Sequence, residues 1–323
     1  MTIEEFFTEV LPKMVSSQAT FNDYSQKIAR PDKVAIFIGA GLSTNYGCSS
    51  WHNLAHKLLD ECRNHGGDYL TVESLKKSSN DYKILITIAK SILPNDAFIS
   101  CVKKSLNLKD NPDGSKKLIP IEPKGCNMYK HLYELFSYFI TTNADTHIDD
   151  AFTKVVIEDF DNYDPSNLNQ KVLYKIHGCI TKPESMIFTS DKYIREYGQE
   201  GTIGKFLKSV FATHKVVFIG YGLSEFEVLE RLLESQSDQQ QNEEKKHYII
   251  LGYYKHEDKL REAYNLYFRQ LGVEQVYFYK DTNGYDELKN KLNEYYLQVE
   301  NKKKPLELFK LIDDALMELL NDQ

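Results

Sequence analysis

Four short clusters of glycine, hydroxyl, amide, carboxylate and imidazole residues each follow an apolar run directly. Gly39–Thr44 (GAGLST) follows the first run and Thr141–Asp145 (TTNAD) follows the second. His177-Gly178 follows the third run, and Gly220–Ser224 (GYGLS) follows the fourth. Glycines let a backbone approach a ligand closely, and exposed N–H groups at such turns can bind phosphate. The clusters therefore predict a site for a phosphate-bearing ligand, with an amide, a carboxylate and a histidine beside it.

The first cluster contains the phosphate-loop candidates. Gly39 and Gly41 can present backbone N–H groups, while Ser43 and Thr44 add hydroxyl donors. An isolated G-x-G-x-S can also be a tight turn that caps a helix. A P-loop is excluded because no lysine lies near Gly47. An oxidoreductase fingerprint is disfavoured because Thr44 occupies the position of its third glycine.

The second and third clusters supply groups for acid–base chemistry. Asn143 and Asp145 either contact a ligand or simply cap the following helix. His177 follows a buried run directly, and Gly178 opens the backbone beside it. We expect His177 to point into the cleft as a general base with a pKa near neutral.

Two other constellations are weaker. His52 and His56 share a helix face, but the glutamate that a zinc protease requires is missing. A serine hydrolase triad would use the residue types of Ser43, His177 and Asp145, yet the G-x-S-x-G motif is absent. We therefore predict neither a metal site nor a serine hydrolase.

The elements that must position these clusters are six apolar runs rich in β-branched and aromatic residues. The runs are Val34–Ile38, Ser137–Thr141, Val172–Ile176, Val216–Ile219, Tyr248–Leu251 and Gln275–Tyr279. Each is nearly continuous in apolar character, which is typical of parallel strands buried on both faces. Helical patterns lie between them. The chain therefore predicts an α/β fold, a doubly wound, Rossmann-like parallel sheet of six strands.

Composition excludes several classes of protein. The 323 residues carry a net charge of -7, which argues against direct nucleic-acid binding. The five cysteines form no C-x-x-C pair, so a disulfide scaffold and common zinc ribbons are excluded. No stretch reaches the ~18 apolar residues of a membrane helix, and the amino terminus lacks the basic start of a signal peptide. We expect a cytoplasmic protein that contacts no membrane.

The spacing of the runs defines a domain plan. Residues 1–30 are expected to form an amino-terminal helical arm, and residues 31–302 the ligand-binding catalytic domain. Nearly a hundred residues separate the first two strands, more than a crossover needs, so we expect a helical insertion at about 66–126. Residues 303–323 are expected to form a carboxyl-terminal helix, as a linker or an oligomer contact.

In their residues and their order the four clusters resemble the sirtuin family, whose signatures follow the same four strands. The matching segments are Gly39–Ser43, Thr141–Asp145, His177-Gly178 and Gly220–Leu223, within a core of roughly residues 31–280. The resemblance implies an NAD site. The binding residues that it implies are Gly39, Ala40, Gly41, Ser43, Thr44, Thr142, Gly178, Gly220, Gly222 and Leu223.

The resemblance also implies three catalytic residues. Asn143 would orient the nicotinamide ribose and the attacking water, Asp145 would accept the carboxamide N–H, and His177 would act as base on the ribose hydroxyls. The chain departs from sirtuin deacetylases in three places. Cys179 stands alone where they carry two C-x-x-C pairs of a zinc module, and Gly47–His52 replaces their G-[IV]-P-D-F-R segment. Gly222 also stands where they usually have a hydroxyl residue.

Without the zinc module the chain resembles the bacterial sirtuin-like NAD hydrolases of anti-phage defence. That resemblance implies cleavage of NAD to nicotinamide and ADP-ribose by a regulated effector of abortive infection. It implies no cofactor beyond NAD as substrate and no zinc. A homo-oligomer is the expected assembly, with a fused or separate phage-sensing or ATPase component. The alternatives are a protein deacylase or ADP-ribosyl transferase, and a non-catalytic module that senses NAD or ADP-ribose.

Overall fold

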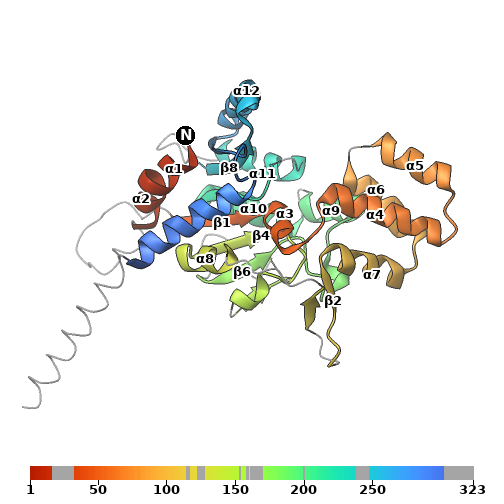
Figure 1. Ribbon diagram of the computed structural model, residues 1–323. Coiled ribbons are helices and arrows are strands. Elements are labelled where there is room, and N and C mark those ends of the chain that lie inside the picture. Colours follow the sequence, from red (N-terminus) through yellow and green to blue (C-terminus); the bar gives the residue numbers. More distant parts are fainter. Residues whose placement is uncertain are drawn as a thin grey trace, which may run out of the picture.

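The fold is built around one parallel β-sheet (Figure 1). A computed structural model describes residues 1–16, 33–79, 81–113, 117–121, 128–152, 154–157, 160, 170–198, 201–223, 225–237 and 247–301. The predicted helix at 303–323, the rest of the predicted arm, the end of the predicted insertion and Ser224 lie outside the described residues.

All seven strands of the sheet are parallel, in the order β5-β6-β4-β1-β7-β8-β9. Their bounds are β1 Lys33–Ile38, β4 Tyr138–Thr141, β5 Lys154–Val156, β6 Val172–Lys175, β7 His214–Ile219, β8 His247–Tyr253 and β9 Val273–Tyr279. The six predicted strands are all present, in the doubly wound order 3-2-1-4-5-6. The doubly wound α/β prediction is confirmed.

The predicted count of six strands is wrong by one, because β5 adds an edge strand beyond β6. Only Val156 of its three residues is fully buried. A strand this short at a sheet edge has too little apolar sequence to form a recognisable run.

The strand register brings the four sequence clusters to the same edge of the sheet. Ile38 at the end of β1 pairs with Thr141 of β4 and with Ile219 of β7. Thr141 pairs in turn with Lys175 at the end of β6. The four strands therefore end at the same level. The order reverses between β1 and β7, and in open α/β sheets the ligand crevice lies at such a switch point.

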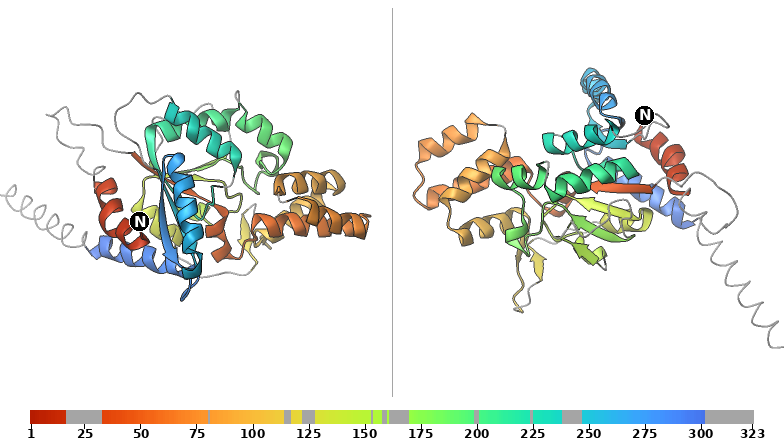
Figure 2. Two further views of the ribbon diagram at one scale, coloured as in Figure 1. Left: turned by 90° about the horizontal axis from the view of Figure 1, so that it is seen from above. Right: turned by 180° about the vertical axis from the view of Figure 1, so that it is seen from behind.

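Helices cover both faces of the sheet, as the two additional views show (Figure 2). On β1, Ala35 and Phe37 belong to one apolar core, whereas Val34, Ile36 and Ile38 belong to the other. This alternation follows from the two-residue period of a strand. The first face packs against α9 Ser190–Tyr197, α10 Thr202–Thr213, α11 Phe226–Ser237 and α12 Asp258–Gln270. The second packs against α8 Met128–Leu135, the amino-terminal helical segment and a helix that covers 286–301.

The amino-terminal segment is a packed layer of this domain. It comprises α1 Ile3–Glu5, a π-helical turn Phe6–Val10 and α2 Leu11–Ser16. Phe6 and Leu11 have no exposed surface. The Met1 carbonyl accepts a hydrogen bond from the Tyr277 backbone N–H of β9. The described part of the predicted arm is therefore anchored to the sheet, and its apolar face is already buried within the same chain.

The predicted insertion is a separate helical layer beyond the strand ends, and it contains a short hairpin. Its elements are α4 Trp51–Asn64, α5 Tyr69–Ser78, α6 Tyr82–Ile92, α7 Asn95–Ser105, β2 Leu108–Asp110 and β3 Leu118–Pro120. The layer begins earlier than the predicted residue 66, because α4 belongs to the same apolar core. The insertion has its own apolar core, which also includes Ala144, Ile180 and Phe188 from the loops after β4 and β6. No helix in the described ranges is long and apolar enough to cross a membrane.

Candidate active site

Two glycine turns meet at the switch point of the sheet. One is Gly39 with the short helix α3 Ala40–Ser43, and the other is the turn at Gly220 after β7. A Cβ on Gly39 would lie 2.5 Å from the Gly220 carbonyl oxygen, and one on Gly41 would lie 2.8 Å from it. Both distances are shorter than real contacts, so glycine is required at both positions for the turns to pack. Gly220 itself has a φ of 64°, a conformation that favours glycine.

The contact between the two turns also occupies the backbone N–H donors of the Gly39–Ser43 turn. The Gly39 N–H donates to the Ile219 carbonyl at 2.9 Å, and the Gly41 N–H donates to the Gly220 carbonyl at 2.8 Å. We predicted that these N–H groups would be exposed and would bind phosphate. In this structure they are satisfied within the protein, because the two turns lie too close to leave them open.

The remaining predicted binding residues differ in their accessibility. Thr44 is exposed, and its hydroxyl donates to the Gly41 carbonyl at 2.7 Å. Thr142 is buried, and its N–H donates to the Ile38 carbonyl at 3.3 Å. Gly222 is exposed with open space around a built Cβ, so it can accept a larger residue. Leu223 and Gly178 adopt positive φ angles of 48° and 73°.

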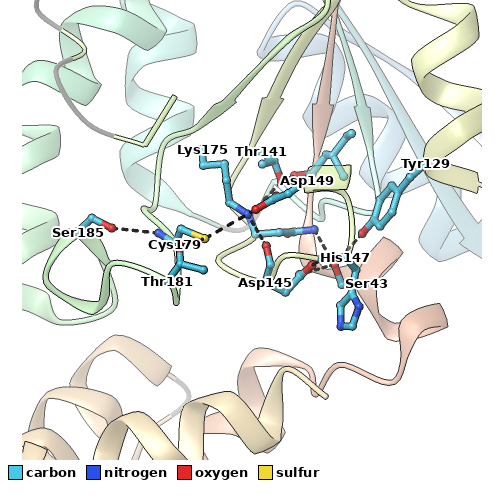
Figure 3. Close-up of polar contacts among 12 residues, drawn as sticks. Ser43, Tyr129, Thr141, Asp145, His147, Asp149, Lys175, Cys179, Thr181 and Ser185 are labelled. Carbon is cyan, nitrogen blue, oxygen red and sulfur yellow. Dashed lines mark hydrogen bonds and ion pairs between the residues drawn. The ribbon is translucent and has the colours of Figure 1, made fainter. Parts of the chain in front are cut away.

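Ser43, Asn143 and Asp145 form one buried hydrogen-bonded cluster with Tyr129. Figure 3 shows Ser43 between Tyr129 and Asp145. The Ser43 hydroxyl lies 2.8 Å from the Tyr129 hydroxyl and 2.7 Å from the Asp145 Oδ2. The Asn143 Nδ2 donates to Ser43 Oγ at 2.8 Å and to the Gly39 carbonyl at 3.2 Å. The structure therefore brings the first and second sequence clusters into direct contact.

The direction of these hydrogen bonds follows from the number of available protons. Ser43 has one hydroxyl proton, and the Asp145 carboxylate can only accept, so Ser43 donates to Asp145. Burial raises the pKa of Tyr129 well above its ordinary value, so its phenol keeps a proton and donates to Ser43. Asn143 therefore uses its amide nitrogen on Ser43 and Gly39. Its Oδ1 is buried without a partner among the described residues.

Lys175, which sequence reasoning missed, supports the same loop through the Asp145 backbone (Figure 3). It is fully buried at the end of β6, and its Nζ donates to the Asp145 backbone carbonyl and to Asp149 Oδ1 at 2.8 Å. Burial would lower the pKa of Lys175, but the nearby Asp149, Cys179 and Asp145 together outweigh this effect, and the pKa lies above its ordinary value. The charged Lys175 therefore fixes the Asp145 backbone.

His177 lies in a second cluster. Its Nε2 is 2.6 Å from the Tyr197 hydroxyl and 3.6 Å from Glu225 Oε2, and its ring packs against Tyr193. Tyr193 and Tyr197 belong to the apolar core on the first face of the sheet. No hydrogen bond joins this cluster to Asn143 within the described segments of the chain. The predicted catalytic residues are therefore divided between two clusters.

The protonation states in the second cluster differ from the prediction. Burial lowers the pKa of His177 to about 3, and the positive charge of Lys83 adds to this effect. We expected a base with a pKa near neutral, but loss of water around the imidazole disfavours its cation. Burial raises the pKa of Glu225 to about 7, with a further contribution from Glu227. Glu225 was missed, although its place directly after the Gly220 turn was a usable signal.

A small cavity of about 30 Å³ lies over Asn143 and Asp145. The insertion and the loop after β6 close it, through Trp51, Leu54, Leu106 and Phe188. The Trp51 and Phe188 rings pack edge to face with centroids 4.9 Å apart. Drug-sized ligands occupy pockets of ~300–1,000 Å³, so this cavity is too small for a ligand of that size.

Polar contacts also hold the insertion against the sheet domain. Lys83 on α6 forms an ion pair with Glu227 on α11 at 2.5 Å. The Thr87 hydroxyl accepts the Ser190 backbone N–H at 2.9 Å at the start of α9. These contacts lie on the surface of the insertion that faces the His177 cluster, so movement of the insertion would alter both clusters together.

The cysteines that the structure describes do not fit a four-thiolate zinc module. Cys179 contacts the Thr181 hydroxyl at 3.2 Å and approaches Asp149, with no other cysteine among its contacts. Cys62 donates to the Leu58 carbonyl within α4, and Cys101 lies on α7. Four thiolates therefore do not converge within the described ranges.

Comparison with known protein families finds a match over part of the sheet domain. Residues 137–273 match the family described as SIR2-like domain. This segment begins just before β4, reaches the start of β9 and contains Asn143, Asp145 and His177. This part of the doubly wound sheet is therefore similar to SIR2-like domains.

One curated relative is Defense-associated sirtuin 2 of Bacillus subtilis. It is 28% identical over 211 residues, which cover 62% of this chain and 19% of the relative. The chain thus spans about a fifth of the length of that protein.

Proposed function

We propose that this protein hydrolyses the nicotinamide–ribose bond of NAD to release nicotinamide and ADP-ribose. The observation that carries the proposal is the buried Asn143 Oδ1, an acceptor without a described partner that lies beside the Asp145 carboxylate at the switch point of the sheet. A buried unpaired acceptor has a free-energy cost of ~1–3 kcal/mol, which a ligand donor would relieve. The SIR2-like domain supports an NAD-utilising enzyme.

The reaction requires little acid catalysis. The bond from the ribose C1′ to the nicotinamide nitrogen breaks, and its electron pair leaves with nicotinamide as a neutral molecule. Water then forms the new bond to C1′ and loses one proton. Most of the catalysis is therefore the stabilisation of an oxocarbenium-like ribose and the placement of water, for which preorganised dipoles are effective.

Each cluster has a distinct role in this scheme. Asn143 Oδ1 accepts a hydrogen bond from the ribose hydroxyl or the attacking water. Asp145 still has free lone pairs, which accept the nicotinamide carboxamide N–H. We place the proton acceptor at the His177–Glu225 pair, since Glu225 is the member whose pKa lies near neutral.

The closed cavity implies a regulated enzyme. A volume of about 30 Å³ cannot hold a dinucleotide, so the insertion must move away before NAD binds. An NAD hydrolase without such control would exhaust the NAD of the cell. The name of the curated relative supports a SIR2-family role in defence, and we propose an NAD-depleting effector of abortive infection. A homo-oligomer, or a fused or separate sensor or ATPase component, would open the site in the cytoplasm.

The direct test is incubation of the purified chain with NAD, followed by chromatographic quantification of nicotinamide and ADP-ribose. The Asn143→Ala variant should lose at least ~100-fold in turnover, the usual effect of removing one preorganised dipole, while retaining its unfolding midpoint. Asn64→Ala is the matched control, because Asn64 is exposed at the end of α4. Equal turnover by both variants would refute the assignment.

The alternatives give different results in the same assay. A deacylase or ADP-ribosyl transferase would release nicotinamide only when an acylated or acceptor protein is present. A sensing module would bind NAD or ADP-ribose in calorimetry and release no nicotinamide. The hydrolase is favoured over a deacetylase because the described cysteines do not form the family's zinc module.

A further inference from the structure

A second group of chemically reactive side chains lies directly beside the proposed NAD site. Cys48, Asp145 and His147 place one sulfur, one oxygen and one nitrogen atom within 4.8 Å of one another. Cys48 and Asp145 are buried, and His147 is half-buried. It is the one group of three or more such residues in the described part of the chain with metal-ligand spacing.

The fold holds these side chains in place from two directions. Cys48 follows Gly47, which has a φ of 87° at the end of the 3-10 turn Thr44–Tyr46. Asp145 and His147 follow β4, and Asp145 Oδ1 accepts the His147 backbone N–H at 3.1 Å. Sequence patterns missed the group because Cys48 is far from the other two residues in the chain.

A backbone carbonyl also lies within this group. The Leu106 carbonyl is 3.3 Å from Cys48 Sγ and 2.9 Å from His147 Nε2. Two of the three candidate ligand atoms therefore already converge on one oxygen. The His147 ring is also stacked on Tyr46 at 5.5 Å, which limits its rotation.

We propose that Cys48, Asp145 and His147 bind a zinc-class divalent cation, with the Leu106 carbonyl or water as the fourth ligand. Thiolate and imidazole favour zinc over magnesium or calcium, which prefer oxygen ligands only. Zinc bonds of ~2.0–2.3 Å need ligand atoms closer than the present spacing, which a change in the Cys48 side-chain rotamer would supply while the His147 ring stays on Tyr46. One thiolate and one carboxylate would neutralise the dication in this buried position.

Binding would rearrange two protons. The Cys48 thiol releases its proton to solvent when the metal–sulfur bond forms. The proton on His147 Nε2, now directed at Leu106, moves to Nδ1 so that Nε2 can coordinate. Metal affinity should therefore rise with pH.

On the proposed function, this site would inhibit turnover. Asp145 is the residue assigned to the nicotinamide carboxamide, so a cation on its carboxylate would compete with NAD. Metal coordination to Leu106 and Cys48 would also fasten the insertion over the closed cavity, which these residues line.

The test measures metal binding without NAD. The full chain is used in a His52→Ala/His56→Ala background, which removes a histidine pair, on α4, whose rings are 4.0 Å apart. Titration with Co²⁺ should produce a thiolate-to-cobalt charge-transfer absorption that Zn²⁺ abolishes at one equivalent. Cys48→Ser should eliminate this absorption and weaken Zn²⁺ binding at least ~100-fold. Cys101→Ser, a half-buried thiol outside the group, is the matched control.

The outcomes separate this inference from the proposed function. Absence of the charge-transfer absorption, or an equal loss in Cys101→Ser, would overturn the metal site. Metal binding by a chain that releases no nicotinamide would support the site and refute the hydrolase. If the chain does hydrolyse NAD, Zn²⁺ should inhibit it and should leave the Cys48→Ser variant at its own zinc-free rate. Inhibition unchanged by Cys48→Ser would refute the inhibitory role.

Discussion

Replacement of Ser43 by alanine tests the buried network that orients Asn143. Ser43 Oγ makes three contacts of 2.7 to 2.8 Å, to Tyr129, Asp145 and Asn143. In Ser43→Ala, Asn143 keeps the Gly39 carbonyl, whereas the Tyr129 hydroxyl and the Asp145 Oδ2 each lose a hydrogen-bond partner in a buried site. Each unsatisfied group has a cost of ~1–3 kcal/mol, so we expect the free energy of unfolding to fall by about 3 kcal/mol.

The control is Ser235→Ala, which removes an equally buried hydroxyl. Ser235 donates only to the Leu232 carbonyl of its own helix, at 2.7 Å, so its loss should lower stability by ~1 kcal/mol or less. Urea unfolding can be followed by far-UV circular dichroism and by fluorescence of Trp51. Trp51 is the single tryptophan of the chain and lines the cavity.

A double variant makes the test independent of the absolute magnitude. Tyr129→Phe in the parent removes a satisfied hydrogen bond and should destabilise by ~1 kcal/mol. In the Ser43→Ala background it removes an unsatisfied hydroxyl and should restore ~1–2 kcal/mol. Additive effects, or equal losses in Ser43→Ala and Ser235→Ala, would refute the proposed direction of the network.

Three further perturbations follow from the geometry. Gly41→Ala should destabilise by ~1–3 kcal/mol, because its Cβ would lie 2.8 Å from the Gly220 carbonyl, whereas Gly222→Ala should be neutral or stabilising in thermal unfolding. Lys175→Met should destabilise by ~3 kcal/mol or more in urea, because it leaves the half-buried Asp149 carboxylate without its cation. Burial raises the pKa of Glu225 from 4.5 to about 7, so the folded state favours the protonated carboxyl group. The contribution of this group to the free energy of unfolding is full below pH 4.5 and is lost as the pH rises to about 7. Glu225→Gln should therefore stabilise the protein by ~2–3 kcal/mol more at pH 8 than at pH 5.

Each of these predictions has a contradicting result. Equal thermal midpoints for the two glycine variants would show that the turns separate easily. The exposed Lys77→Met is the control for Lys175, and similar losses in both would exclude a structural role for the buried charge. A pH-independent difference between Glu225→Gln and the parent would show that the Glu225 carboxylate remains hydrated.

Much of the fold could be read from the sequence because the apolar runs carry strong local information. All six predicted strands are present in the doubly wound order, and the helical insertion lies between the first two. The edge strand Lys154–Val156 and the hairpin in the insertion were missed. Both are short and pair at exposed edges, so their formation depends on neighbouring strands more than on their own residues.

The sequence by itself determined which residues follow the strand ends, because parallel strands of equal register bring those residues to one edge. Only the tertiary structure decided which of them touch. In the folded chain Ser43, Asn143 and Asp145 are hydrogen-bonded to one another, whereas His177 lies in a separate cluster with Glu225. The Gly39 and Gly41 N–H groups donate to carbonyl groups of the protein itself. The reason is that burial, hydrogen-bond partners and pKa values depend on contacts between segments far apart in the chain, which spacing along the sequence does not encode.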